Sequence, residues 1–400
     1  MTTLPKKLYY IIVLGIGLQL CFLFFLMEPN ALEWSDPKDY FAIASRIANG
    51  NSFSLDINNL YRSPGYPYFL SVIISLLGPN ILLVRLVHIF LFSFFIIGTY
   101  KLGALWLNKE FGILFSLLSA IYPYFIYIPL TLYPEALLIY ISPWVLYYLL
   151  RISQKADTGS LIMISVLLSI GVLTRPTYLA IGFIFALYYL FMQNTILNKI
   201  KILFFAFSIP LVFIVGWGYR NYLVHDHFII STAANINLYK SYNENSTIYT
   251  KSNVKIPEEF LEKLKSTKNI FEQDSLFKIE AIKFIRTHPA KSLFLATFKC
   301  LDLWNPIPHT VTNYPLYKKI IGSILFITFL LLSILGFYKK RNDPFIRLLL
   351  IILIFNTVSN GIFAVSIRYR VVFDIIILLT AVFWLYINYS AKTWFMKIMK

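Results

Sequence analysis

Two carboxylates and one guanidinium stand in a polar stretch that follows the first long apolar run of the chain. Asp36 and Asp39 are separated by one helical turn, and Arg62 follows further along the same stretch. An ionised carboxylate can take a proton from a hydroxyl or an amine, and a guanidinium binds phosphate or carboxylate through parallel hydrogen bonds. The stretch therefore offers a general base together with an anion-binding cation.

Each carboxylate also has a simpler interpretation. Asp36 precedes Pro37, and this pair is typical of a helix start, where a carboxylate caps the first turn. Glu135 begins an apolar run after a short loop, so it too could cap a helix or act in a site. We therefore keep the capping and the catalytic roles of Asp36 and Glu135 open. Asp39 stays an alternative to Asp36 as the base.

Membrane helices must position these residues. The 400-residue sequence is 58% hydrophobic and 14% charged, and its apolar runs repeatedly exceed the about 18 residues that a membrane-spanning helix needs. We therefore predict an all-α polytopic membrane protein. The net charge of +17 would suggest nucleic acid for a soluble protein. Here the cations lie between apolar runs, where they set orientation, so we expect membrane lipids and no nucleic acid as partners.

The apolar runs predict about ten transmembrane helices, near residues 8–27, 81–107, 111–129, 135–150, 160–174, 176–192, 200–219, 320–338, 345–363 and 371–388. Segment 66–77 is too short for a crossing, so we place it at the outer surface. The positive-inside rule then puts both termini in the cytoplasm of a multi-pass plasma (inner) membrane protein. The cations that share the cytoplasmic side on this topology are Lys6, Lys7, Lys101, Lys109, Arg151, Lys155, Lys199, Lys201, Lys339, Lys340, Arg341, Lys392, Lys397 and Lys400.

This topology leaves two outer segments in a single membrane domain over 1–400. The first outer loop, 28–80, carries juxtamembrane helices. The long outer loop, 220–319, contains residues 256–287, whose charged and apolar side chains alternate at helical spacing. We predict one or two amphipathic helices there, lying on the membrane surface.

The cations at the outer span ends and in the short outer loops are nearly all arginines, with Lys38 as the exception. A charge at a bilayer costs a few kcal/mol unless it is paired or hydrated, so this set suggests an anionic ligand on the outer side. The alternative is that the arginines reach lipid headgroups. The set comprises Arg46, Arg62, Arg85, Arg175, Arg220, Arg368 and Arg370.

A metal site has weaker support. The sequence His225-Asp226-His227 supplies two metal-ligating side chains on a loop but no full ligand set. The sequence indicates no particular cofactor, and a divalent metal stays open.

Several short motifs occur in a fixed order along the chain, and together they resemble the GT-C superfamily of integral-membrane glycosyltransferases. The resemblance is to the branch of the protein O-mannosyltransferases and the aminoarabinose transferase of lipid A, and it covers about residues 8–388. The motifs are Asp36-x-x-x-Tyr40-x-x-Ile43-Ala44, Arg62-Ser63-Pro64-Gly65-Tyr66-Pro67, Pro134-Glu135, Leu173-Thr174-Arg175-Pro176, Arg220-Asn221-Tyr222 with Asn237-Leu238-Tyr239, and Arg368-Tyr369-Arg370.

The resemblance implies a GT-C fold and an enzyme that moves a hexose or pentose from a polyprenyl-phosphate carrier to a lipid, glycan or protein acceptor. It implies that Asp36 is the base and that Glu135 positions the acceptor or the base. Two departures stand out: no large soluble C-terminal domain is expected, and Asp36-Pro37 replaces two adjacent acids, with Asp39 as a possible stand-in. The residues that it implies for substrate binding are Arg62, Tyr66, Arg175, Arg220, Asn221, Arg368, Tyr369 and Arg370.

The chemistry of such a donor needs one base and a cationic cradle. A lipid phosphate is a stable leaving group without protonation, so no carboxylic acid is needed to protonate it. Direct displacement by the acceptor in a single step would invert the anomeric carbon. A lipid-linked polysaccharide polymerase or ligase is the nearest alternative, because it would also use outer arginines. A secondary transporter is less favoured, because the polar residues crowd one face instead of the bilayer midplane and the halves show no repeat.

Overall fold

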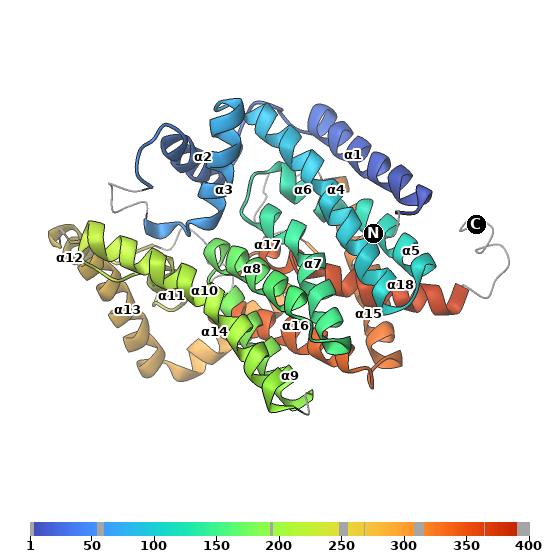
Figure 1. The fold of residues 1–400 in the computed structure, drawn as a ribbon. Coiled ribbons are helices and arrows are strands. Elements are labelled where there is room, and N and C mark those ends of the chain that lie inside the picture. Colours follow the sequence, from blue (N-terminus) through green and yellow to red (C-terminus); the bar gives the residue numbers. More distant parts are fainter. Residues whose placement is uncertain are drawn as a thin grey trace.

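The computed structural model describes residues 4–53, 60–192, 195–247, 255–267, 269–307, 316–363 and 365–389. Within these residues the chain is helical and contains no β-strand (Figure 1). Six helices are long and apolar enough to span a bilayer, and a bent pair of helices would form a seventh span. The predicted all-α polytopic class is therefore confirmed.

A helix or a pair of helices coincides with every predicted span. The six long helices are α1 (Lys6–Leu26), α4 (Ile81–Trp106), α7 (Glu135–Gln154), α10 (Ile196–His225), α15 (Leu316–Lys339) and α16 (Pro344–Ile362). Three shorter apolar helices are α8 (Thr158–Thr174), α9 (Tyr178–Met192) and α18 (Asp374–Tyr389). The C-terminal lysines used to predict orientation, Lys392, Lys397 and Lys400, lie outside the described residues.

The predicted span at 111–129 is broken in the middle. It is divided into α5 (Lys109–Ala120) and α6 (Pro123–Leu130), which are bent by 54° at the break. Tyr122 has an extended backbone (φ −69°, ψ 118°) because the ring of Pro123 disfavours a helical conformation in the residue before it. The bend brings the chain through a short turn to the start of α7.

The first outer loop contains α2 (Ser35–Ala48) and α3 (Gly65–Leu77), and α3 matches the segment predicted to lie at the outer surface. Tyr40 of α2 and Tyr66 of α3 meet in a buried apolar cluster. A Cβ on Gly65 would lie 2.7 Å from backbone atoms of Leu173 and Thr174. Glycine therefore lets the start of α3 touch the end of α8.

The long outer loop is largely helical. It contains α11 (Ala233–Ser241), α12 (Glu258–Ser266), α13 (Ile270–Thr287) and α14 (Pro289–Leu303), and the short α17 (Ile367–Val371) lies between α16 and α18. Helices α12 and α13 match the predicted amphipathic segment, whereas α11 and α14 were not predicted. Helix α10 continues past the predicted start of this outer loop at Arg220 to His225, and it ends at Asp226, which has a left-handed backbone (φ 58°).

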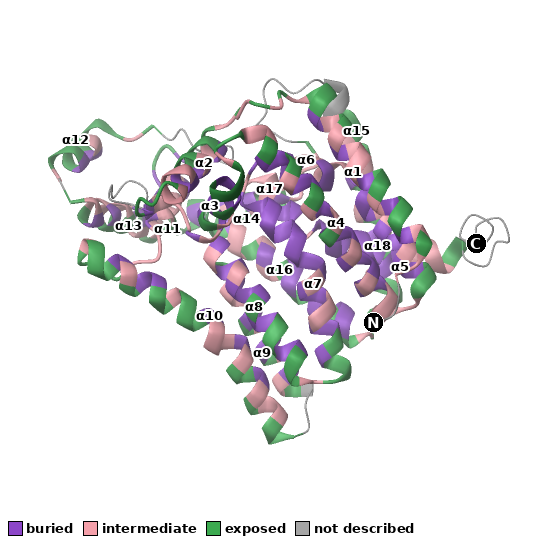
Figure 2. Ribbon diagram, turned by 45° about the horizontal axis from the view of Figure 1, so that its top comes forward, coloured by how far each residue is buried: buried purple, intermediate pink, exposed green. Residues whose placement is uncertain are grey.

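These elements place the outer loops together at one end of the helix bundle. In Figure 1, α2, α3 and α11 to α13 lie on the left, whereas α1 begins and α18 ends on the right. Figure 2 shows α7 and α18 buried along most of their length and α10 largely exposed. The buried central helices thus provide a rigid base for the polar residues at the loop end.

Candidate active site

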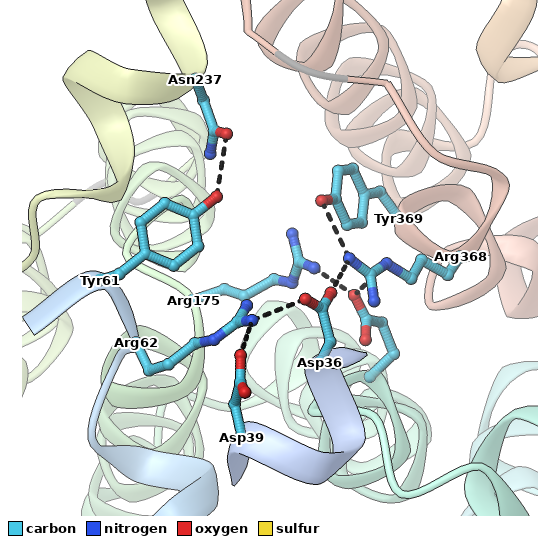
Figure 3. A network of polar contacts seen from close by, with 9 residues as sticks. Asp36, Asp39, Tyr61, Arg62, Arg175, Asn237, Arg368 and Tyr369 are labelled. Atoms are coloured by element: carbon cyan, nitrogen blue, oxygen red, sulfur yellow. Dashed lines mark hydrogen bonds and ion pairs between the residues drawn. The ribbon is translucent and has the colours of Figure 1, made fainter. Parts of the chain in front are cut away.

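Asp36 lies at the start of α2 and is held by two arginines from distant parts of the chain. Its Oδ1 accepts a hydrogen bond from Nη2 of Arg62 at 2.6 Å, and its Oδ2 accepts one from Nη2 of Arg368 at 2.6 Å (Figure 3). The cap position of α2 is Trp34, which makes no side-chain cap bond. The carboxylate of Asp36 is therefore engaged by guanidinium groups and not by the first turn of its helix.

Arg62 joins both acids of α2. Its Nη2 lies 2.7 Å from Oδ2 of Asp39, because residues three apart on a helix project from the same face. The guanidinium carbon lies 5.0 Å from the ring centres of both Tyr40 and Tyr61. The aromatic faces and the two carboxylates fix the position of this cation.

Glu135 is the buried acid of the site. Its side chain is fully buried at the start of α7, where it is paired with Arg175 from the end of α8. Nε of Arg368 lies 3.8 Å from the same oxygen, Oε1. The other oxygen, Oε2, has no hydrogen-bond partner within the described part of the chain. Glu135 thus orients two of the three guanidinium groups.

Tyrosine rings pack against two of the arginines. The guanidinium carbon of Arg175 lies 3.9 Å from the ring centre of Tyr369, and that of Arg368 lies 4.3 Å from the ring centre of Tyr133. We call the six acidic and basic side chains joined by these ion pairs the arginine–carboxylate cluster: Asp36, Asp39, Glu135, Arg62, Arg175 and Arg368. Its three carboxylates and three guanidinium groups balance in charge.

The charges of the cluster decide the ionisation of Asp36. Burial raises the pKa of the Asp36 carboxyl, but Arg368 and Arg62 together outweigh burial and hold the pKa below its usual value. The same balance applies to Tyr369: burial raises the pKa of its hydroxyl, and Arg368 and Arg175 bring the pKa below the usual value. The site therefore stabilises negative charge.

An apolar pocket is lined in part by residues that closely follow members of the site in the sequence. It lies between α7, α9, α16 and α18, and its walls include Ile181, Ile352, Tyr178 and Phe373. Tyr178 follows Arg175 by less than one helical turn, and Phe373 follows Tyr369 by about one turn. The pocket is thus connected to the cluster through two short stretches of chain.

Comparisons with known proteins agree with this architecture. Residues 61–219 match the family model described as dolichyl-phosphate-mannose-protein mannosyltransferase. The oligosaccharyltransferase of Archaeoglobus fulgidus is similar in two solved forms. The form with Zn and sulfate gives a TM-score of 0.58 at 12% identity, and the form with an inhibitory peptide and a dolichol-phosphate gives 0.58 at 13% identity. The chain therefore shares the fold of these archaeal structures, which is the GT-C fold.

The GT-C resemblance predicted from the motifs is therefore confirmed at the level of the fold. The two alignments cover 98% of this chain and 50 or 51% of the archaeal chain, so this chain spans about half the length of that protein. A search of curated protein sequences found no match.

Of the residues predicted for substrate binding, Tyr369 contacts the arginine–carboxylate cluster, whereas Tyr66, Arg220, Asn221 and Arg370 make other contacts. Arg220 lies over the Trp217 ring (5.2 Å) and donates to Asn221, which in turn donates to a backbone carbonyl of the same outer segment. Tyr66 is fully buried beneath Tyr40, with ring centres 5.5 Å apart. These contacts hold the chain together instead of facing the cluster.

Arg370 likewise makes contacts that stabilise the fold. It is fully buried, pairs with Asp374 at 3.2 Å, and donates to the backbone carbonyls of Leu303 and Asn305. The guanidinium therefore ties the start of α18 to the end of α14. Its neighbour Arg368 belongs to the cluster, and the ring of Tyr369 contacts Arg175 and Arg368. The first two residues of this short motif thus lie at the site, whereas the third makes structural contacts.

Three residues near the cluster were not predicted as site residues: Tyr61, Tyr133 and Lys240. Tyr61 directly precedes Arg62, and Tyr133 lies two residues before Glu135. This proximity to a predicted site residue was the one signal for them in the sequence. Lys240 comes from α11, which the sequence did not reveal. Within the described residues no three His, Cys, Asp or Glu side chains are grouped closely enough to hold a metal ion, and His227 instead stacks on Phe271.

Proposed function

We propose that this protein is a glycosyltransferase that moves a sugar from a polyprenyl-phosphate donor to an acceptor, with Asp36 as the general base. The observation that carries the proposal is the position of the Asp36 carboxylate between Arg62 and Arg368. A carboxylate and two guanidinium groups at one point supply both halves of the reaction, a proton acceptor and a binding site for phosphate. The GT-C fold and the match to a dolichyl-phosphate-mannose mannosyltransferase model support it.

The donor phosphate would compete with the carboxylates for the arginines. Each oxygen of Asp36 accepts a hydrogen bond from a guanidinium, and this pairing lowers the pKa of the carboxyl and weakens it as a base. A phosphodiester that binds Arg62 or Arg368 would release an oxygen of Asp36. The same event would thus bind the donor and produce the free base.

The reaction is then a single displacement. The acceptor oxygen or nitrogen forms a bond to the anomeric carbon and gives its proton to Asp36. The bond between that carbon and the phosphate oxygen breaks, and its electron pair leaves on the lipid phosphate, where the arginines stabilise it. The configuration at the anomeric carbon inverts. Glu135 holds Arg175 and Arg368 in place, and Asp39 is the second candidate for the base.

The apolar pocket fits the lipid part of the donor. Its walls are almost entirely aliphatic and aromatic, and Tyr178 and Val372 in its lining follow Arg175 and Arg368 closely in the chain. We infer that the first part of the prenyl chain lies there. On the predicted topology the sugar is transferred at the outer face, to an envelope or protein acceptor. One of the similar archaeal structures is tethered to an acceptor peptide, which makes a protein acceptor worth testing.

Sugar transfer by the purified protein tests this proposal. The protein, in lipid nanodiscs, is given mannosyl or other glycosyl polyprenyl phosphates with candidate peptide, glycan and lipid acceptors. Asp36→Asn is expected to lower turnover by about 10²- to 10⁴-fold, the usual contribution of a general base, while donor binding is kept or tightened because two arginines lose a competing anion. Sealed right-side-out vesicles with an external peptide acceptor test the outer location.

Two variants serve as controls. Glu262→Gln changes an exposed acid on α12, away from the cluster, and should leave transfer unchanged. Asp39→Asn separates the two candidate bases, since it should retain most turnover if Asp36 is the base. Near-normal transfer by Asp36→Asn would remove Asp36 from that role, and donor uptake without transfer would contradict the enzyme class.

A further inference from the structure

Helix α11 is fixed to the arm that carries Arg62. The amide of Thr232 donates to the Leu60 carbonyl at 3.1 Å, and the hydroxyl of Ser231 donates to the Tyr61 carbonyl at 3.1 Å. The hydroxyl of Tyr61 donates to Oδ1 of Asn237 at 3.1 Å (Figure 3). Two hydrogen bonds donated from just before α11 and one accepted within it thus hold α11 against Leu60 and Tyr61, next to Arg62.

The far end of α11 is held as well. Lys299 of α14 is buried and donates from Nζ to the carbonyl of Ser241, the last residue of α11, at 3.0 Å. The same Nζ lies 4.5 Å from the ring centre of Tyr242. A free helix carbonyl and an aromatic face are both favourable for a cation. Helix α11 is therefore anchored at both ends.

Lys240 projects from this anchored helix toward the cluster. It lies one turn after Asn237, and its Nζ is 5.9 Å from the ring centre of Tyr61, the ring that also contacts Arg62. Lys240 is half-buried and makes no ion pair within the described part of the chain. Burial lowers the pKa of its ammonium group, while Asp36 raises it and Arg62 lowers it, so Lys240 lies within the field of the cluster.

The charges near this point leave one cation without a counterion. The three carboxylates of the arginine–carboxylate cluster are balanced by its three guanidinium groups. A half-buried ammonium beside a neutral cluster is unfavourable unless an anion pairs with it. A phosphodiester carries one negative charge, so it would supply the counterion that Lys240 lacks.

We propose that Lys240 binds the phosphate of the lipid donor from the outer side, opposite the arginines. This inference rests on the proposed function and adds a fourth cation to the phosphate site, supplied by the long outer loop. Lysine suits this position because its ammonium is a point charge on a flexible chain, which can follow the phosphate as the sugar leaves.

Binding of dolichyl phosphate and of dolichol, the same lipid without phosphate, tests the inference. Native mass spectrometry or thermophoresis of the whole protein in detergent measures both. Lys240→Met keeps the length of the side chain and removes its charge, so it should weaken dolichyl phosphate binding by about 10-fold or more, as loss of a charge-assisted hydrogen bond does, and leave dolichol binding unchanged. Lys240→Arg should restore most of the binding.

Lys291→Met is the matched control. Lys291 lies in the same loop, stacks on an aromatic ring (5.3 Å from Phe284) and donates to a carbonyl of the loop, so its loss removes a similar lysine without touching the cluster. It should bind dolichyl phosphate as the wild type does. Thermal unfolding of each variant shows whether it is folded.

The outcomes separate the two proposals. Folded Lys240→Met that binds dolichyl phosphate as tightly as the wild type would overturn the role of Lys240 and leave the proposed function intact, and this includes the case in which Lys240 binds an anion on the acceptor. Equal loss for dolichol and dolichyl phosphate would also overturn it. Wild-type protein that does not discriminate the two lipids would contradict the proposed function itself.

Discussion

Asp36 is chemically distinctive because two guanidinium groups share its carboxylate. Both hydrogen bonds are 2.6 Å long, and the two arginines lower the pKa more than burial raises it. A carboxylate held in this way binds protons weakly and is a poor base until one arginine is withdrawn. Its reactivity therefore depends on how the arginines are occupied, which links donor binding to base strength.

This link predicts a difference between two pH profiles. The profile of kcat/KM reports the free enzyme, in which the lowered pKa keeps Asp36 ionised, so it should show no acid limb above about pH 4. The profile of kcat reports the donor complex, in which phosphate competes for the arginines. Its acid limb should therefore lie at a higher pH than that of kcat/KM. Initial rates across a range of pH with saturating and limiting donor measure both.

Asp39→Asn is the control for this pH dependence. The Asp39 side chain is more than half exposed and forms an ion pair with Arg62. Its loss should therefore leave the separation of the two limbs in place. An acid limb of kcat/KM near pH 6, or identical limbs in both profiles, would contradict the competition between donor phosphate and Asp36.

At the same scale, residue type predicted part of the site. The outer arginines indicated an anionic ligand, and Arg62, Arg175 and Arg368 do converge on the acids. Arg85 does not, because it is fully buried and donates to the carbonyls of Glu28, Pro29, Ala31 and Leu130, which fixes the chain ahead of α2. A buried arginine that binds carbonyls and one that binds an anion look alike in sequence. Only the fold distinguishes them.

At the scale of elements, apolar runs predicted the presence of the helices better than their ends. The run ends near Tyr219, yet α10 continues for six residues, because polar residues at a membrane surface do not stop a helix and the left-handed Asp226 does. The break before Pro123 was hidden for the opposite reason, since both sides of it are apolar. Helix α11 is short and polar, so no hydrophobic period marked it.

Close packing of α3 against α8 predicts the effect of Gly65→Ala. The new methyl group would lie 2.7 Å from the backbone of Leu173 and Thr174, which no rotamer change relieves. We expect a loss of about 1–3 kcal/mol in the free energy of unfolding, and a higher KM for the donor because Arg62 moves relative to Arg175. Thermal unfolding and donor titration measure the two effects.

Gly17→Ala provides the comparison in another membrane helix. A Cβ at Gly17 meets nothing within 4 Å, so this substitution should be neutral or slightly stabilising. Gly65→Ala that is as stable and as active as Gly17→Ala would show that the contact of α3 with α8 does not position the arm.

At the scale of the molecule, the cluster depends on long-range packing. Its members come from α2, the arm before α3, the start of α7, the end of α8 and α17, and Asp36 and Arg368 are separated by 332 positions in the chain. Motif order along the sequence predicted the GT-C fold, and the comparisons confirm that fold. Which arginine binds which acid could not be predicted, because sequence order carries no distances. The single membrane domain and the cytoplasmic termini remain predictions.

The most direct test of the account is an experimental structure of the protein with dolichyl phosphate bound. We predict a phosphate in contact with Arg62 or Arg368, at least one Asp36 oxygen released from its guanidinium, and the prenyl chain in the pocket beside Tyr178. A phosphate bound elsewhere, with both Asp36 oxygens still held by the same two arginines, would contradict the claim that the donor and the base share these arginines.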